Sequence, residues 1–325
     1  MLKRQLFFLH LILRKMLSGE LAVEEILTSF DLILFDCDGV IWQGGELLPK
    51  VQEALSKIEL NKIKTKFITN TSTRSVEAMH NRMKSFGLAS VNIADCFHSG
   101  VAVAHLIHTE YPQVKRVYMV GESGLRVELE KVGLVVIGGA EENDLRMTDD
   151  VFRSLDKEDP VDAIVVGYDM GFNFYKLARA CNFFQKNNCL FFACNADLTD
   201  KIGSKYIPGN GAALAAIVAS ISQIPNIAFR APLIVGKPNK IFANLVLQKS
   251  NLSDIPRERV LVIGDRMDTD IQLAKNCGFK SCLVLSGCAT ENDLIGLDES
   301  DLPDYLLTGL SQLVDYGNFS FEPFT

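Results

Sequence analysis

Short, wholly apolar runs alternate along the chain with segments of helical periodicity. Leu32-Ile33-Leu34-Phe35 and Val260-Leu261-Val262 are two such runs, and each ends at a group of polar residues. A strand buried on both faces of a parallel sheet has this continuous apolar pattern. A helix is predicted where Val76, Met79, Met83 and Phe86 recur at helical spacing before Gly87. The alternation predicts an α/β protein with parallel sheets built from βαβ units.

The middle of the chain predicts a second set of elements, which amounts to a domain of its own. Helices are expected at 101–108, 122–132 and 174–186, and strands at 116–120, 134–137, 163–166 and 190–194. The expected division is an N-terminal extension at 1–29, a core at 30–98 and 209–325, and an inserted domain at 99–208. Residues 141–159 are rich in acids and are expected to form a solvated surface loop.

Composition narrows the class of protein. The 325 residues are 48% apolar and 22% charged, which is enough for two domains with cores. A net charge of −7 argues against binding to nucleic acid or to anionic lipid, because both carry negative charge. Eight scattered cysteines without a CxxC pair are typical of a reduced intracellular protein, so we expect a cytoplasmic location.

Residues 1–16 need separate treatment, because 6–13 are apolar and flanked by basic residues. The run is too short to span a membrane, so no stable membrane span is expected. Three interpretations stay open. The segment is an extension with Met16 as the true start, an organelle-targeting segment, or a docked helix.

Two acids follow the first apolar run. Asp36 and Asp38 emerge where the predicted strand 32–35 meets a loop. Ligands in open α/β sheets bind beyond the carboxyl ends of such strands. Two like charges side by side are costly to bury unless a cation or a proton is shared between them. Taken alone, the pair fits two solvated loop acids equally well.

Three further segments add chemistry at other strand ends. Asp265 and Asp270 follow the strand at 259–262, Thr69 ends another strand at a helix start, and Lys237 follows a third. A helix start with free N–H groups is an anion site. Acids for a metal, a helix start for an anion and a lysine together predict a phosphoryl-transfer site.

With these residues in this order, the chain resembles the haloacid dehalogenase-like phosphatases. It is most similar to the branch of phosphoglycolate phosphatase, pyridoxal phosphatase and 4-nitrophenylphosphatases, from about residue 30 to about residue 315. The segments that carry the likeness are 35–42, 166–169, 208–212, 235–238 and 264–270. Thr71 and Ala196 depart from the usual pattern, where the family has a second Asn and a larger polar residue. The resemblance implies a Rossmann-like core with an inserted C2-type α/β cap, hinged near Ser99-Gly100 and Ile207-Gly209.

The resemblance also implies roles for the acids. Asp36 would be the nucleophile that forms an aspartyl-phosphate, and Asp38 the general acid and then the general base. Strand alternation is expected to place both on one side. Mg²⁺ would be held by the Asp36 side chain, the Asp38 backbone carbonyl and Asp265, with Asp270 binding directly or through water. Asp268 is expected to cap a helix instead.

Phosphate binding is expected from the other two motifs. The Thr69 hydroxyl and the backbone N–H groups of Asn70 and Thr71 would hold the transferring phosphoryl group, and Lys237 would neutralise its charge and orient Asp36. Taken singly, a Thr-Asn at a helix start is usually only a cap.

Substrate choice is expected from the cap loop at 195–201. The resemblance makes Asn195, Asp197 and Asp200 the residues that reach the leaving group, and an ordinary polar connecting loop fits them as well. Cys37, between the two acids, is expected to pack inside the protein.

Together these features predict an Mg²⁺-dependent phosphatase for a small phosphorylated metabolite. The substrate that we expect before any other is 2-phosphoglycolate. The alternatives are pyridoxal 5′-phosphate and the general substrate range of a 4-nitrophenylphosphatase. A non-catalytic phospho-ligand binding protein is the alternative of another class, and Asp38 favours the enzyme because mere binding needs no acid-base residue there. A homodimer through the cap is expected from the resemblance.

Overall fold

The computed structural model describes residues 19–187, 189–202, 205–225 and 229–315. The interpretations of residues 1–16 lie outside these ranges. The chain divides into two compact units, each described by itself below. The first unit holds the described residues up to 68 together with 83–95 and 246–315. The second unit holds residues 69–82 and 96–245.

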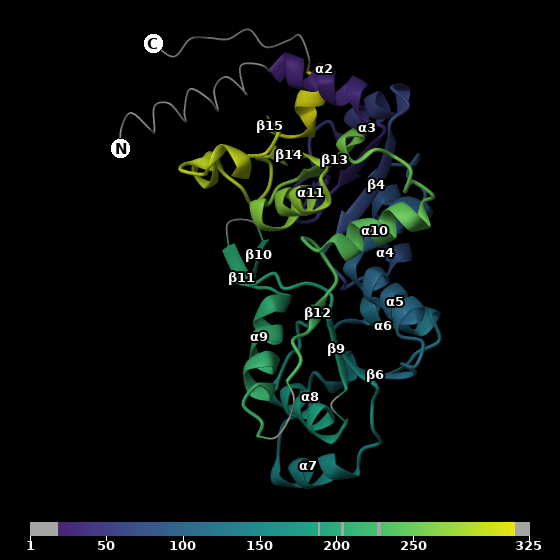
Figure 1. Cartoon of the computed structure of the whole chain (residues 1–325), viewed down its shortest axis with the longest axis vertical. Helices are drawn as coiled ribbons and strands as arrows, with labels where there is room; N and C mark the ends of the chain where they lie inside the picture. The colour runs from purple at the N-terminus through teal and green to yellow at the C-terminus, as the bar shows by residue number, and fades with distance from the viewer. Residues whose placement is uncertain (1–18, 188, 203–204, 226–228, 316–325) are drawn as a thin grey trace. The chain divides into compact units, whose positions relative to one another are not determined.

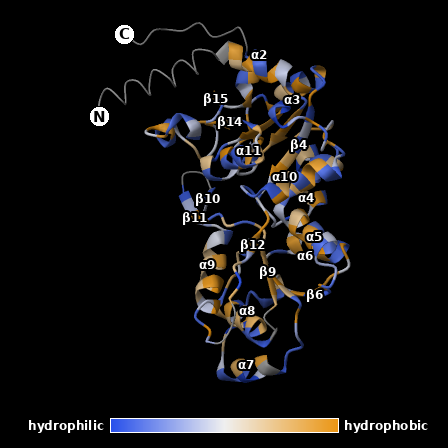
Figure 2. Cartoon of the chain, in the orientation of Figure 1, coloured by the Kyte–Doolittle hydropathy of each residue, from blue (hydrophilic) through white to orange (hydrophobic). Residues whose placement is uncertain are grey.

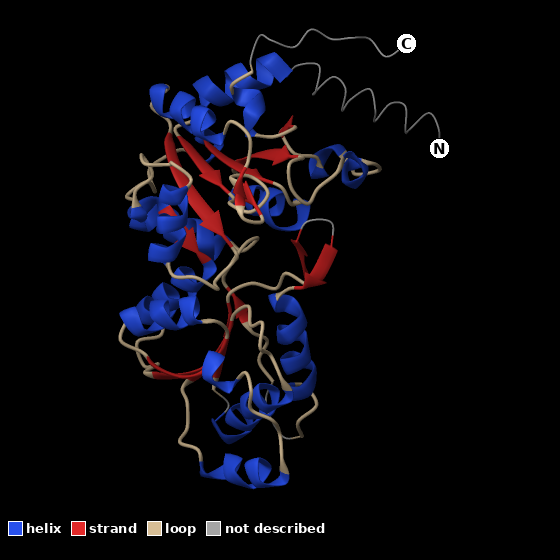
Figure 3. Ribbon diagram, turned by 180° about the vertical axis from the view of Figure 1, so that it is seen from behind, coloured by secondary structure: helices blue, strands red, loops and turns tan. Residues whose placement is uncertain are grey.

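A parallel sheet forms the centre of the first unit. Within this unit its strands are β1 (Leu32–Phe35), β4 (Lys64–Thr69), β13 (Val260–Gly264), β14 (Lys280–Val284) and β15 (Tyr305–Leu307). They lie in the order β15-β14-β13-β1-β4. Leu32 pairs with Val260 on one side and with Lys64 on the other. The whole of β1 is buried, as its apolar run predicts, and helices flank the sheet (Figure 3).

Helices and short turns complete the first unit. They are α2 (Gly19–Ser29), α3 (Val51–Leu60), η1 (Ile93–Asp95), η4 (Arg257–Arg259), a π-helical turn η5 (Met267–Ile271), α11 (Gln272–Cys277), η6 (Glu291–Leu294), η7 (Glu299–Asp301), η8 (Leu310–Leu313) and the hairpin of β2 (Trp42–Gln43) and β3 (Glu46–Leu47). Two helices run from the second unit into the first, namely α4 (Val76–Ser85) and α10 (Lys240–Lys249). Figure 1 labels α2, α3, α4, α10 and α11 along the chain.

A second parallel sheet forms the centre of the second unit. Its strands β6 (Arg116–Val120), β7 (Val135–Gly138), β8 (Ala163–Val166), β9 (Leu190–Ala193) and β12 (Leu233–Ile234) lie in the order β12-β9-β8-β6-β7. Buried Tyr118, Ile164, Phe183, Leu214 and Ile217 belong to one hydrophobic cluster of this unit. Figure 2 shows the hydrophobic colour of β9 and β12 beside more polar loops. The strands predicted from the sequence are confirmed.

The other elements of the second unit are β5 (Cys96–His98), α5 (Ser99–Glu110), α6 (Ser123–Lys131), η2 (Ala140–Glu142), α7 (Asp149–Ser154), η3 (Leu155–Lys157), α8 (Phe174–Asn187), α9 (Asn210–Ile221), and the antiparallel pair β10 (Thr199–Ile202) and β11 (Lys205–Pro208). The sequence-based division at 208 and 209 assigned α9 and β12 to the core. Their contacts place them in the second unit instead, because α9 contributes Leu214 and Ile217 to its hydrophobic cluster and β12 pairs with β9.

Most of residues 141–159 are exposed, as predicted, but the prediction that they form a loop is wrong. This stretch contains η2, α7 and η3, and the side chain of Glu142 is buried. Glu142 accepts a hydrogen bond from the Tyr118 hydroxyl at 2.9 Å and forms an ion pair with Arg179. Local composition concealed this because the neutralising groups come from β6 and α8, which are distant in sequence.

Two expectations about the protein's environment can be compared with the structure. No helix among the described residues is both long and apolar enough to cross a membrane. All eight cysteines lie in the described part of the chain, where they are free thiols, and Cys37 is buried as expected.

Candidate active site

Three buried aspartates meet in the first unit. Asp36 follows β1, Asp265 follows β13, and Asp270 lies in η5. Their ligand atoms all lie within 4.8 Å of one another, and the residues are 5%, 2% and 0% exposed. The cluster forms because β1 and β13 are parallel neighbours whose carboxyl ends lie together. The Asp36 N–H donates to the Ile263 carbonyl at 2.8 Å, which extends this pairing one residue beyond β1.

Glycines allow the backbone to approach Asp265 closely. Gly39 has a φ of 78°, and a Cβ at Gly39 or at Gly287 would overlap the Asp265 carboxylate. The N–H of Cys288 donates to Asp265 Oδ2 at 2.6 Å and fixes its orientation. Sequence reasoning missed Gly287 and Cys288, because no local pattern connects residues 287–288 with a carboxylate twenty-two residues earlier.

The donor set of this cluster fits a divalent cation. Three carboxylates buried so close together repel one another unless positive charge is shared between them. Carboxylate oxygens are the hard ligands that Mg²⁺ prefers in proteins. Asp36, Asp265 and Asp270 are therefore the residues that would hold the ion.

The remaining acids of the two loops lie differently. β1 ends at Phe35, so strand alternation does not govern Asp38, which is exposed. Its Oδ1 accepts a hydrogen bond from Trp42 Nε1 at 2.8 Å. Asp268 is exposed and forms an ion pair with Arg266 at 2.8 Å. Asp268 lies inside η5 and Arg266 occupies the N-cap position, so the expectation that Asp268 caps the helix is wrong.

A polar cluster in the second unit is organised around Asn70, which is 7% exposed. The Lys237 N–H donates to Asn70 Oδ1 at 2.8 Å, and Asn70 Nδ2 donates to the Lys237 carbonyl at 3.1 Å. This reciprocal pair fastens the lysine motif to the residue that follows Thr69. The Lys237 side chain is buried, and the Lys237-Pro238 peptide bond is cis.

The predicted cap loop is bound to the same asparagine. Asn70 Nδ2 lies 3.0 Å from Asp197 Oδ2, and the Asn70 carbonyl accepts from Asn195 Nδ2 at 2.8 Å. Asn195 also accepts the Asp197 N–H at 3.2 Å, so its buried side chain is occupied by protein groups. Asp200 is exposed, and its carboxylate accepts the Lys201 N–H at 3.0 Å. Asn195 and Asp197 thus hold the loop in place, whereas Asp200 does not join the cluster.

Two more residues of this cluster were missed. Ser99 Oγ donates to the Asn70 carbonyl at 2.6 Å, and Asn210 Nδ2 donates to the Asn195 carbonyl at 2.6 Å. Asn210 lies in the Pro-Gly-Asn-Gly segment that resembles the family, which was the available signal. Thr69 is buried at the end of β4, and its Oγ1 accepts the N–H of exposed Thr71 at 3.1 Å.

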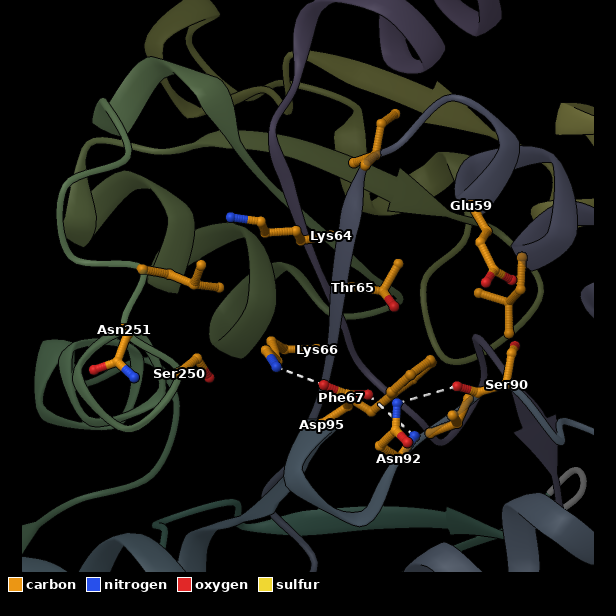
Figure 4. A pocket seen from close by; sticks show the side chains of 14 residues that line it. Glu59, Lys64, Thr65, Lys66, Phe67, Ser90, Asn92, Asp95, Ser250 and Asn251 are labelled. Carbon is orange, nitrogen blue, oxygen red and sulfur yellow. Dashed lines mark hydrogen bonds and ion pairs between the residues drawn. The ribbon is translucent and has the colours of Figure 1, made fainter.

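A pocket of about 420 Å³ lies elsewhere in the first unit. Figure 4 shows Lys64, Thr65 and Lys66 of β4 between Ser250 on one side and Ser90 on the other. An ion pair of 2.5 Å between Lys66 Nζ and Asp95 Oδ1 occupies part of it. None of the three clustered aspartates lines this pocket.

Comparison with known proteins identifies the family. Residues 33–135 match the model of a haloacid dehalogenase-like hydrolase, and residues 234–313 match a HAD-hydrolase-like model. The first match contains Asp36 and Thr69, and the second contains Lys237 and Asp265. The 4-nitrophenylphosphatase of Schizosaccharomyces pombe is 30% identical over 93% of this chain and 99% of its own length. The chain belongs to the haloacid dehalogenase-like hydrolases.

Further relatives agree with this assignment. Phosphoglycolate phosphatase 2 of Arabidopsis thaliana is 32% identical over 90% of this chain and 94% of its own length. The crystal structure of glycerol phosphate phosphatase from Mycobacterium tuberculosis, in complex with magnesium, is 26% identical with a TM-score of 0.71. That match covers 90% of this chain and 78% of the other. As a phosphatase of this family, the chain is a phosphoric monoester hydrolase, and such phosphatases generally use a divalent metal.

Proposed function

We propose that this protein is an Mg²⁺-dependent phosphatase that hydrolyses small phosphomonoesters through an aspartyl-phosphate on Asp36, with 2-phosphoglycolate as its first substrate. The observation that carries the proposal is the buried cluster of Asp36, Asp265 and Asp270. In this cluster the proposed nucleophile Asp36 lies beside two further carboxylates, and the three carboxylates together fit a cation. The relatives' names support the reaction class.

The proposed reaction has two steps. Asp36 attacks phosphorus, forming a carboxylate O–P bond as the ester P–O bond breaks, and Asp38 protonates the departing alkoxide. Asp38, now a carboxylate, takes a proton from water, which attacks the same phosphorus. Inorganic phosphate leaves and the Asp36 carboxylate is restored. Asp36, Asp265 and Asp270 would hold the cation, which would neutralise charge on the phosphoryl oxygens.

Two groups of the second unit are assigned to the phosphoryl group. The Thr69 hydroxyl binds a phosphoryl oxygen, and the Lys237 ammonium offsets its negative charge. The Asn70 side chain is used to hold Lys237 and Asp197, so its backbone N–H, and not its side chain, is assigned to the phosphoryl group. The role of the side chain is to keep the phosphate-binding residues in register.

The substrate follows from the relatives and not from a contact. The name of the relative phosphoglycolate phosphatase 2 supports 2-phosphoglycolate as the substrate. The sequence resemblance supports pyridoxal 5′-phosphate as the alternative. Glycerol phosphate is added to the candidate substrates because the structural relative is named glycerol phosphate phosphatase. A non-catalytic phospho-ligand binding protein is the alternative of another class. The carboxyl of Asp38 favours the enzyme, because simple binding of a ligand needs no acid-base residue at this position.

The test is phosphate release from 2-phosphoglycolate, pyridoxal 5′-phosphate, glycerol phosphate and 4-nitrophenyl phosphate with Mg²⁺ present, compared by kcat/KM. We expect the highest value for 2-phosphoglycolate. The Asp36→Asn variant should fold and lose more than about a thousandfold in rate, or roughly 4 kcal/mol of transition-state stabilisation. Release at the wild-type rate by this variant would refute the nucleophile assignment. No release from any ester by the wild type would refute the enzyme.

A further inference from the structure

Helix α6 contacts the segment that follows the Thr69 motif through one of its faces. Gly124, Glu128 and Lys131 are spaced i, i+4 and i+7 and therefore lie on the same side of the helix. They meet successive residues of the segment from Thr73 to Glu77, which leads into and begins α4. All of these residues belong to the second unit.

The contact at Gly124 is between backbones. The Gly124 N–H donates to the Thr73 carbonyl at 3.2 Å. A Cβ at position 124 would overlap the backbone of Arg74, so a residue with a side chain would force the two segments apart. This approach brings the Glu128 carboxylate, one helical turn later, to the first residue of α4.

Glu128 caps α4 from another helix. The first N–H groups of a helix lack partners within it, and a carboxylate there is favoured by the helix dipole. Directly before α4, Ser75 provides a local cap, because its Oγ accepts the Ala78 N–H at 3.3 Å. The Val76 N–H instead donates to Glu128 Oε1 at 3.0 Å. The two caps together fix the point at which the loop ends and the helix begins.

Further charges hold Glu128 in this place. Lys131 Nζ donates to Glu128 Oε1 at 3.0 Å and to Glu77 Oε1 at 2.8 Å, which links the two helices again. His98 Nδ1 accepts the Gly100 N–H, so the imidazole proton lies on Nε2, 3.7 Å from Glu128 Oε1. Burial opposes the charge on Glu128, and these neighbours outweigh it, lowering its pKa from 4.5 to about 2.

We propose that Glu128 is a positioning residue for catalysis, which holds the loop from Thr69 to Ser75 in the conformation that binds the phosphoryl group. The proposal rests on the proposed function of Thr69. Asn70 anchors one end of the loop through Lys237 and Asp197. Glu128 anchors the other end at Val76. Thr69 is the last residue of β4 and directly precedes the first anchor, and its Oγ1 accepts the N–H of Thr71, which lies between the two anchors.

The kinetic test compares Glu128→Gln with Glu130→Gln. Glu130 lies on the same helix and is paired with Arg126, so its variant removes a charge without touching α4. Phosphate-binding groups act alike on substrate and transition state, so loosening them should raise KM more than it lowers kcat. We expect Glu128→Gln to raise KM and the inhibition constant of inorganic phosphate by about tenfold each, with kcat changed less than about threefold. Glu130→Gln should match the wild type.

Hydrogen exchange tests the same contact without turnover. The amides of residues 71–79 should exchange faster in Glu128→Gln than in the wild type or in Glu130→Gln. Lys131→Met, which changes a partly exposed side chain, should give a smaller change in the same direction and serves if Glu128→Gln does not fold.

Two results would overturn the proposal. Unchanged exchange would mean that Glu128 does not hold the loop. Faster exchange with wild-type KM and phosphate inhibition would mean that its role is structural only. A wild-type chain that releases no phosphate from any ester would refute the proposed function instead, and the exchange data would still decide whether Glu128 anchors the loop.

Discussion

Asp36 and Asp38 are two residues apart but have different surroundings. Asp36 is buried with Asp265 and Asp270, whereas Asp38 is exposed and hydrogen-bonded to Trp42. A buried carboxylate beside a cation suits a nucleophile, and an exposed carboxyl can exchange protons with the leaving group and with water. These environments support the roles that we propose for Asp36 and Asp38, and the roles stay a prediction.

The Asp38→Asn variant should separate the two steps. The 4-nitrophenolate leaving group needs little protonation, so the first step should remain fast with 4-nitrophenyl phosphate. The second step lacks its base, and a burst of 4-nitrophenol should precede slow turnover. Rapid-quench measurement of the burst checks this. Equal slowing of both steps without a burst would count against the assignment of Asp38.

At the scale of elements, the role that we expect of the cap loop at 195–201 changes from substrate recognition to support of the site. The sequence suggested that Asn195 and Asp197 recognise the leaving group, and the structure ties both to Asn70. We expect Asn195→Ala and Asp197→Ala to lower kcat/KM on 2-phosphoglycolate and on 4-nitrophenyl phosphate in parallel, by about ten- to a hundredfold, because lost loop anchoring affects every ester. Asp200→Asn is the matched control on the exposed part of the loop. A loss confined to 2-phosphoglycolate would restore the specificity role.

The junction of α4 and α6 makes an acid-dependent contribution to stability. The pKa of Glu128 is lowered from 4.5 to about 2, against burial, by His98, the Val76 N–H and Lys131. Its contribution is therefore complete above pH 4.5 and is lost as the pH falls through 2. Glu128→Gln should be less stable than wild type at pH 7 by about 1 to 3 kcal/mol, and the gap should narrow between pH 4.5 and 2. Thermal unfolding of both chains across this range measures it, and a gap independent of pH would contradict the ionised carboxylate.

At the scale of the whole molecule, the acidic cluster should couple metal binding to stability. An ion that binds only the folded chain at a hundred times its dissociation constant adds about 2.7 kcal/mol to the free energy of unfolding. We expect EDTA to abolish turnover, and Mg²⁺ to restore it and raise Tm. Asp265→Asn should lose the rise in Tm, whereas Asp268→Asn should keep it. An equal rise in Asp265→Asn would place the cation elsewhere.

We also expect a homodimer formed through the second unit. Met170 and Phe174 of this unit are 74% and 78% exposed, so both side chains can be buried in an interface. Light scattering at micromolar concentration should give twice the chain mass of 36.0 kDa, and Phe174→Glu should reduce it to one chain. A monomeric mass for the wild type would refute the dimer.

Local pattern was enough for most of the elements and for the acidic cluster of Asp36, Asp265 and Asp270. The apolar run of β1 predicted a buried strand because such runs are stable only between two covered faces. Asp36, Asp265 and Asp270 were recognised because they follow strands of one parallel sheet, whose carboxyl ends share an edge. The family resemblance then ordered these residues into a reaction, and the comparisons confirmed the family.

Only the tertiary structure decided which polar side chains hold the protein together. The sequence predicts a solvated Glu142, but its carboxylate is paired with Arg179 and Tyr118. The sequence also predicts that Asn195 contacts the substrate, but its amide donates to the Asn70 carbonyl. Glu128 gave no signal in its own segment, because its partner is the N–H of Val76, fifty-two residues away. A strand or helix is encoded by residues that are neighbours in sequence. The partner of a buried polar group is set by chain folding, because the cost of burial can be offset by a donor or acceptor from any element that packs against it.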